Sequence, residues 1–237
     1  MGINICVIPA RGGSKRIPRK NIKLFAGKPM IAYAIEAAQA SGLFDHILIS
    51  TDDEDIAGIG REWGAEVPFM RPHELADDHT PTVPVMVHAI EAWESLGWDV
   101  DMLCCIYPCV PFIQVGDLVA GLNLLEGCDA KFSFPVTKFP AAIQRALKRD
   151  QDGKLSPVFP GYELLRSQDI EPTYHDAGQF YWGSKSAWLT VDRIHSNAIG
   201  IAIPEWRAVD IDSLDDWYRA EVMYKILNTD EHNECNG

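Results

Sequence analysis

The chain has 237 residues, 47% of them hydrophobic and 23% charged, with a formal net charge of −13. This composition is ordinary for a globular chain, and the length fits one α/β domain, residues 1–237, with a modest insertion. The negative charge argues against nucleic-acid binding, no apolar run approaches the ~18 residues of a membrane span, and the N-terminus does not resemble a signal peptide. We therefore expect a cytoplasmic protein with no nucleic-acid or membrane partner.

A short apolar run opens the chain and ends in a basic, glycine-containing turn. Ile5–Ile8 predicts a buried parallel strand, and Pro9 ends it. Two adjacent glycines, Gly12 and Gly13, let the backbone turn its N–H groups toward an anion. The five cations that surround them lie within ten residues: Arg11, Lys15, Arg16, Arg19 and Lys20. The pattern fits neither a Walker A loop nor G-x-G-x-x-G. It favours a polyphosphate site, and a basic surface turn is the alternative.

The next helix and strand are expected to bring a second strand end to the same polyphosphate site. A helix is expected with Pro29 at its first position and Gly42 as its C-terminal cap. The strand His46–Ser50 follows and ends in Thr51-Asp52-Asp53. Ligands of α/β sheets bind at such carboxyl ends. The alternative is that Asp52 or Asp53 only caps the helix that begins near Asp53.

A long polar loop follows the short strand predicted at 65–68. It reads F-M-R-P-H-E-L-A-D-D-H-T-P-T from Phe69 to Thr82 and contains Arg71, a candidate ligand contact or a surface partner of Glu74. We expect a helix over 84–96 and a central strand over 102–106, which ends in Tyr107-Pro108-Cys109. A helix at 117–126 and a strand at 130–135 complete this part.

The pattern changes between 137 and 175. Short alternating segments surround a D-Q-D-G turn, so 142–148 and 154–158 are expected to form a hairpin within a β-rich insertion. A strand over 176–182 returns to the core, and its amide residue Gln179 needs hydrogen-bond partners. A short helix at 184–189 and a strand at 199–203 come next.

Two carboxylates form the second chemical feature. Asp210 and Asp212 flank Ile211, and in a strand the period of two would place them on one face. Neighbouring carboxylates repel unless a cation bridges them, and Mg²⁺ prefers oxygen ligands. The alternative is that Ser213 caps the last helix and Asp212 only flanks it. After that helix we expect a polar tail over 229–237.

The segment A-R-G-G-S-K-R-I-P-R-K-N, Ala10 to Asn21, resembles the N-terminal motif of the sugar-acid cytidylyltransferases. This family includes CMP-sialic acid synthetases and pseudaminic acid cytidylyltransferases, and the chain is most similar to the latter branch. The resemblance covers nearly the whole length. It implies a Rossmann-like, mostly parallel sheet of the nucleotide-diphospho-sugar transferase type, and a homodimer that the 137–175 insertion helps to form. Cys109 stands where the family commonly has Thr, so a hydroxyl is missing there.

The resemblance implies transfer of CMP from CTP to the anomeric hydroxyl of a nine-carbon sugar acid, with release of pyrophosphate. Pseudaminic acid is the expected acceptor, because Tyr181 and Trp182 would favour a methyl end. N-acetylneuraminic acid is the alternative acceptor, and a related transfer onto an eight-carbon acid or another nonulosonate, or from another nucleotide, is also open. A non-catalytic nucleotide sensor is a further alternative, but it would have no need of Asp210 and Asp212.

The same resemblance assigns roles to individual residues. The R-P-x-E-L-A segment places Arg71 near the cytosine. The expected nucleotide-binding residues are Ala10, Arg11, Gly12, Gly13, Ser14, Lys15, Asn21, Arg71, Thr82 and Tyr107. The expected catalytic residues are Arg11, Lys15, Lys20 and Asp212, and Asp210 and Asp212 are expected to bind Mg²⁺. The candidate sugar contacts are Asn21, His175 and Gln179.

Overall fold

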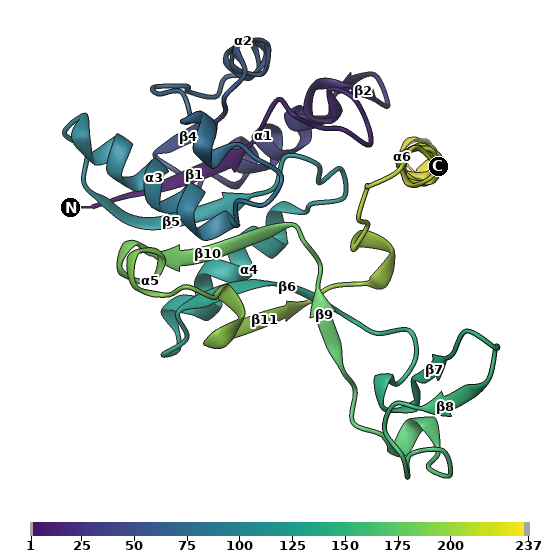
Figure 1. The fold of residues 1–237 in the computed structure, drawn as a ribbon. Helices are drawn as coiled ribbons and strands as arrows, with labels where there is room; N and C mark the ends of the chain where they lie inside the picture. Colours follow the sequence, from purple (N-terminus) through teal and green to yellow (C-terminus); the bar gives the residue numbers. More distant parts are fainter. Residues whose placement is uncertain (1, 235–237) are drawn as a thin grey trace.

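The computed structural model describes residues 2–234 and has a central sheet with helices on both faces (Figure 1). Its strands, in spatial order, are β11 (Ala198–Ala202), β6 (Phe132–Lys138), β10 (Phe180–Ser184), β5 (Val100–Ile106), β1 (Ile3–Pro9) and β4 (His46–Ser50). β9 (Tyr174–Asp176) also belongs to this seven-stranded sheet and pairs with β6. β10 is antiparallel to both of its neighbours and β9 is antiparallel to β6, while the other five strands run in one direction. The expected α/β fold with a mostly parallel sheet is confirmed.

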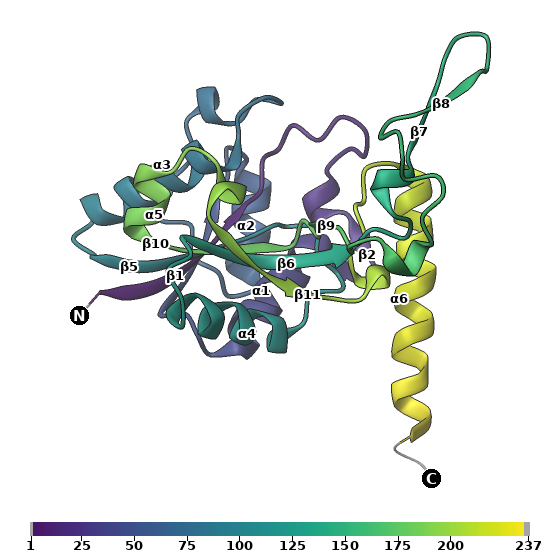
Figure 2. The same cartoon turned by 90° about the horizontal axis from the view of Figure 1, so that it is seen from below.

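Successive side chains of β1 point into two different apolar clusters, as the period of a strand requires. Cys6 and Ile8 pack with α1 (Met30–Ser41) and α4 (Val115–Glu126), while Ile5 and Val7 pack with α3 (Thr82–Ser95) and α5 (Lys185–Thr190). The two helix pairs therefore cover opposite faces of the sheet (Figure 2). α2 (Glu54–Glu62) adds Ile56 to the first cluster. The buried strands leave only their ends free for a ligand.

The predicted strand over 176–182 is divided in the structure. β9 (Tyr174–Asp176) and β10 both pair with β6, through Val136↔Asp176 and Ser133↔Trp182. Between them the chain bends at Gly178, whose φ of 64° lies in the left-handed region that favours glycine. The bend places residues 177–179 outside the regular ladder.

The hairpin within 137–175 forms, but it is shorter than expected. β7 (Leu147–Arg149) and β8 (Leu155–Pro157) pair in antiparallel fashion, and the one-turn helices η3 (Ile143–Arg145) and η4 (Ser167–Asp169) flank them. The hairpin projects away from the sheet (Figure 1).

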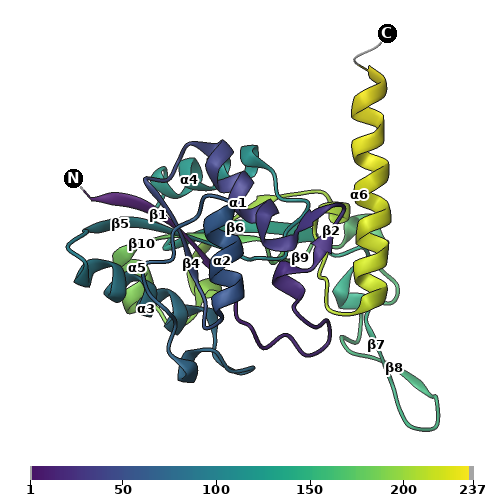
Figure 3. The same ribbon diagram turned by 90° about the horizontal axis from the view of Figure 1, so that it is seen from above.

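A third apolar cluster holds the C-terminal part. β2 (Leu24–Phe25) pairs with β3 (Lys28–Pro29) beside η1 (Lys20–Ile22), and the Phe25 ring packs edge-on against Trp217 at 5.4 Å. Trp217 belongs to α6 (Leu214–Glu234), which extends away from the sheet (Figure 3). The helix continues through part of the expected 229–237 tail, and residues 235–237 lie outside the described chain. Within residues 2–234, no helix combines the length and hydropathy that a membrane crossing needs.

Candidate nucleotide and sugar site

The loop after β1 is fixed to the end of β4. The backbone N–H of Ala10 donates to the Ser50 carbonyl at 3.0 Å, and that of Gly12 donates to the Asp52 carboxylate at 2.9 Å. A Cβ on Gly12 would lie 2.6 Å from a carboxylate oxygen of Asp53, so close packing requires glycine there. Asp53 also caps α2 by accepting from two of its backbone N–H groups, as the alternative reading of this residue supposed.

Each of the five loop cations pairs with a carboxylate of the same chain. Arg11 and Lys15 both bind Asp78. Arg16 contacts Asp212 at 2.7 Å, Lys20 lies 3.6 Å from the same carboxylate, and Arg19 contacts Asp53 and Asp55 at 2.5 and 2.6 Å. The mutual repulsion that suggested an anionic ligand is thus partly relieved within the protein.

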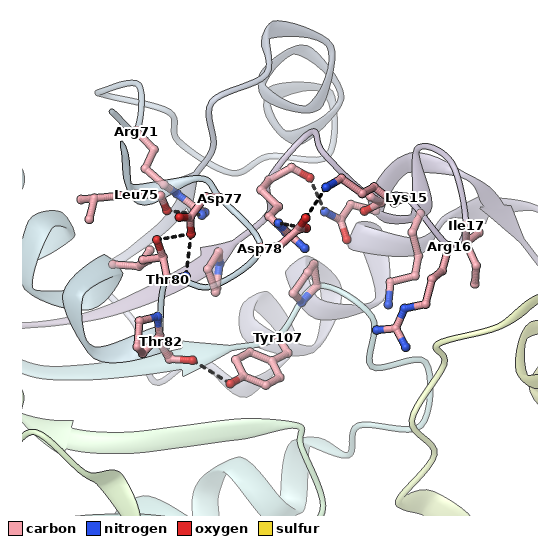
Figure 4. Close-up of a pocket in the computed structure, with 18 of the residues that line it drawn as sticks. Lys15, Arg16, Ile17, Arg71, Leu75, Asp77, Asp78, Thr80, Thr82 and Tyr107 are labelled. Atoms are coloured by element: carbon pink, nitrogen blue, oxygen red, sulfur yellow. Dashed lines mark hydrogen bonds and ion pairs between the residues drawn. The ribbon is translucent and has the colours of Figure 1, made fainter. Parts of the chain in front are cut away.

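A cavity of about 280 Å³ lies beside this loop (Figure 4). Many of its lining residues were predicted as nucleotide or catalytic residues: Arg11, Ser14, Lys15, Lys20, Asn21, Arg71, Thr82, Tyr107 and Asp212. Ala10, Gly12 and Gly13 do not line it; Ala10 and Gly12 serve the loop through the contacts to β4 described above. The cavity sits where β1, β4 and β5 end, as expected for a ligand site of an α/β sheet.

Arg71 lies in the wall of this cavity and is only 6% exposed. Its Nε donates to the Ser50 hydroxyl at 3.1 Å, and its Nη2 donates to the Ser50 carbonyl. The alternative of a surface pair with Glu74 is therefore wrong. Burial lowers the pKa of Arg71 to about 10, although the nearby Asp52 opposes the shift. A buried guanidinium with donors left over is suited to hydrogen-bond a ligand's carbonyl.

A second cavity, of about 420 Å³, adjoins the first. The two share Lys20, Asn21, Tyr107 and Pro108 as lining residues. The remaining wall of the second cavity contains Cys109, His175, Asp176, Ala177, Gly178, Ala208, Val209, Asp210 and Ile211. Of the residues predicted to contact the sugar, Asn21 lines both cavities and His175 lines the second.

Gln179, Tyr181 and Trp182 lie elsewhere than expected. The Gln179 side chain is 3% exposed, does not line either cavity, and donates to the Arg207 carbonyl at 2.7 Å. Tyr181 and Trp182 are 4% and 0% exposed and belong to the cores on the two faces of the sheet. The idea that these two aromatic rings select a sugar is wrong, because strand β10 is buried on both faces.

The two carboxylates of the D-x-D segment face different cavities. The predicted strand that would place both carboxylates on one face is wrong. Residues 208–212 form no strand, and they connect the one-turn helix η6 (Glu205–Arg207) to α6. Asp212 lines the first cavity and Asp210 lines the second, while the side chain of Ile211, between them in the sequence, is buried. Burial, and then the charge of Asp212, raises the pKa of Asp210. A cation between the carboxylates would relieve this cost.

Two further residues near the cavities, Asp78 and Asp176, were not predicted as site residues. Asp78 contacts Arg11 at 2.6 Å across the first cavity. Asp176 accepts from the Gly178 N–H at 2.7 Å and from the Tyr181 hydroxyl at 2.8 Å, so its carboxylate holds the bend before β10. The contact of Asp78 with the basic loop depends on the tertiary fold, whereas these two contacts of Asp176 are local in the sequence. The substitution at Cys109 costs little hydrogen bonding, because its thiol contacts the Asn21 side-chain oxygen at 3.5 Å.

The sequence matches the cytidylyltransferase family over residues 5–180, and the chain belongs to that family. It is 40% identical over 226 residues to the pseudaminic acid cytidylyltransferase of Campylobacter jejuni strain 81-176, with 94% of this chain and 97% of the relative covered. It is 38% identical to the CMP-N,N'-diacetyllegionaminic acid synthase of Legionella pneumophila, with 94% and 96% covered. The solved CMP:2-keto-3-deoxy-manno-octonic acid synthetase, in complex with CTP, shares the fold with a TM-score of 0.68 at 16% identity, with 94% and 98% covered.

Proposed function

We propose that this enzyme transfers CMP from CTP to the anomeric hydroxyl of a nine-carbon sugar acid, with pseudaminic acid as the preferred acceptor. The observation that carries the proposal is the shared wall of the two cavities. Lys20 and Asn21 line both, and Asp210 and Asp212 face one cavity each. A nucleotide in the first cavity and a sugar in the second would therefore meet beside the D-x-D segment.

In the proposed reaction, the anomeric oxygen attacks the α-phosphorus of CTP. The new oxygen–phosphorus bond forms as the bond to the β-phosphate breaks, pyrophosphate leaves, and the hydroxyl gives up its proton. Arg11, Lys15 and Lys20 would stabilise the charge that accumulates on the phosphates. Positioning of the two substrates supplies the other main contribution. Arg71, from the opposite wall, would hydrogen-bond the cytosine.

Asp210 and Asp212 fit a magnesium ion. They offer hard oxygen ligands, and burial, followed by the negative charge of Asp212, raises the pKa of Asp210. When bound, Mg²⁺ would neutralise phosphate charge and lower the pKa of the attacking hydroxyl. A nucleotide sensor would not need this pair, so the carboxylates favour the enzyme.

The acceptor follows from the relatives and from the cavity wall. Two pseudaminic acid cytidylyltransferases are each 40% identical to this chain over 94% of its length. Ala177, Ala208 and Val209 make one part of the second cavity apolar. Such a wall suits the methyl end of pseudaminic acid better than the polar glycerol tail of N-acetylneuraminic acid, which is the second candidate.

A pyrophosphate-release assay tests this function. CTP, UTP, ATP and GTP would each be combined with pseudaminic acid, N-acetylneuraminic acid and an eight-carbon sugar acid, in the presence of Mg²⁺. We expect turnover with CTP and the highest kcat/KM with pseudaminic acid. Equal rates with CTP and UTP would contradict the role of Arg71. CTP binding without turnover on any acid would support a sensor.

We expect a homodimer that acts in the cytoplasm. The hairpin region exposes large apolar side chains, with Leu155 62% and Leu164 96% exposed, which is typical of a contact surface. The five cysteines within the described chain are free, in keeping with a reducing compartment. Light scattering at micromolar concentration should show the mass of two chains, and a monomer would contradict the dimer.

A further inference from the structure

One carboxylate binds two of the cations that are proposed to hold the triphosphate. The Asp78 side chain contacts the Arg11 guanidinium at 2.6 Å through one oxygen and the Lys15 ammonium through the other. It reaches them from the far side of the cavity, from the loop between η2 (His73–Leu75) and α3 (Figure 4). Lys15 first, and then Arg11, holds the pKa of Asp78 at about 2, so it is ionised at neutral pH.

The neighbouring residue fixes the loop that presents Asp78. The Asp77 carboxylate accepts from the backbone N–H groups of His79 and Thr80 at 2.9 and 2.6 Å, and from the Thr80 hydroxyl at 2.6 Å. The Asp77 carboxylate therefore accepts hydrogen bonds from the backbone of this turn, while the Asp78 carboxylate pairs with the two cations. The two adjacent acids therefore have different roles.

We propose that Asp78 is an internal counter-ion of the triphosphate site, which the phosphates of CTP displace from Arg11 and Lys15. The inference deepens the proposed function and rests on it, because it takes the first cavity as the CTP site. Carboxylate and phosphate oxygens prefer the same donors. A triphosphate placed on Arg11 and Lys15 would also lie beside the negative charge of Asp78, which repels it.

Two consequences follow from this competition. Asp78 keeps the loop cations together while no phosphate is bound, and it lowers the affinity for any polyphosphate that needs them. Because pyrophosphate is the proposed leaving product, the return of Asp78 to Arg11 and Lys15 would also favour its release. Asp78 is therefore a residue that sets phosphate affinity, rather than one that touches the reacting atoms.

The test compares Asp78→Asn with the wild-type chain by calorimetric titration with CTP and Mg²⁺. The variant keeps the size of the side chain and removes its charge. We expect CTP to bind about three- to tenfold more tightly, the range given by the loss of two partly exposed ion pairs. The gain should shrink in high salt, which screens such pairs. Inhibition by added pyrophosphate should strengthen by a similar factor.

Glu74→Gln is the matched control, because it removes one charge from the one-turn helix η2 just before this loop, at an exposed residue that lines neither cavity. Its Kd for CTP should stay within about twofold of wild type. Cytidine, which has no phosphate, should bind Asp78→Asn and wild type equally. Equal or weaker CTP binding by Asp78→Asn would overturn the inference alone. No CTP binding by the wild-type chain would overturn the proposed function as well.

Discussion

Ile17 of the basic loop and Ile211 of the D-x-D segment are buried in the same apolar cluster, with 1% and 2% of their surface exposed. The carbonyl of Ile211 also accepts from the Lys20 ammonium at 2.7 Å. The two chemical parts of the site, far apart in the sequence, are therefore held together by apolar burial. Charged side chains on either part can be changed without removing this connection.

The first prediction concerns Asp210→Asn. Because burial, and then the charge of Asp212, raises the pKa of Asp210, ionisation costs more in the folded protein than in the unfolded chain, and an amide removes that cost. We expect the Tm without metal to hold or rise, while the Mg²⁺ concentration needed for half-maximal turnover increases at least about tenfold. Asp192→Asn, at an exposed position, is the control and should change neither value. Unchanged Mg²⁺ dependence would contradict the metal assignment.

The second prediction concerns the anchor of the D-x-D segment. Arg207 pairs with Asp117 at the start of α4, with the two side chains 12% and 15% exposed, and the Arg207 carbonyl accepts from Gln179. Asp117→Asn should lower stability by about 3 kcal/mol, as expected when one partner of a buried pair is removed. It should also raise the Mg²⁺ requirement more than the KM for CTP. Asp117→Glu, which keeps the charge, should recover part of the lost stability and part of the Mg²⁺ affinity. If Asp117→Asn leaves the Mg²⁺ requirement unchanged, the ion pair contributes to stability only and does not position the D-x-D segment.

The sequence predicted the parts of the site that follow strand ends. Arg11, Lys15, Asp52 and Tyr107 come directly after three apolar runs, and the carboxyl ends of parallel strands meet at one edge. It could not predict Asp78, because a contact across the cavity depends on how a long loop folds. It also misplaced Gln179, because the Arg207 carbonyl that satisfies its amide comes from a segment 28 residues further along the chain.

The third prediction is a pH dependence that arises from His88 on α3. Its ring packs edge-on against Phe69 at 5.4 Å. Burial, and then the charge of Arg71, lowers its pKa below the usual 6.5, although Glu91 and Glu74 oppose the shift. The fold thus favours the neutral His88 ring. The contribution of His88 to the free energy of unfolding is therefore full above pH 6.5, the usual pKa, and is lost as the pH falls through the lower pKa of the folded protein.

Urea unfolding of wild type and His88→Gln between pH 8 and pH 5 measures this effect. The glutamine variant cannot titrate in that range, so its free energy of unfolding should fall less than that of wild type on acidification. The difference between the two proteins should be constant above pH 7. A wild-type chain that gains stability relative to the variant at pH 5 would reverse the assigned sign.

The last prediction is the effect of Lys15→Ala. Lys15 is 79% exposed at its side chain, and its partner in the structure is Asp78, so its removal disturbs no core. If Lys15 stabilises charge on the transferring phosphates, kcat/KM should fall about 100-fold or more, as it does when one such donor is lost elsewhere. The Tm should stay within about 2 °C, as for other exposed substitutions. Lys131→Ala, at an exposed position remote from both cavities, is the control and should keep full activity. Near-normal turnover by Lys15→Ala would make Lys15 an ordinary surface lysine and remove the basis for assigning the loop to the triphosphate.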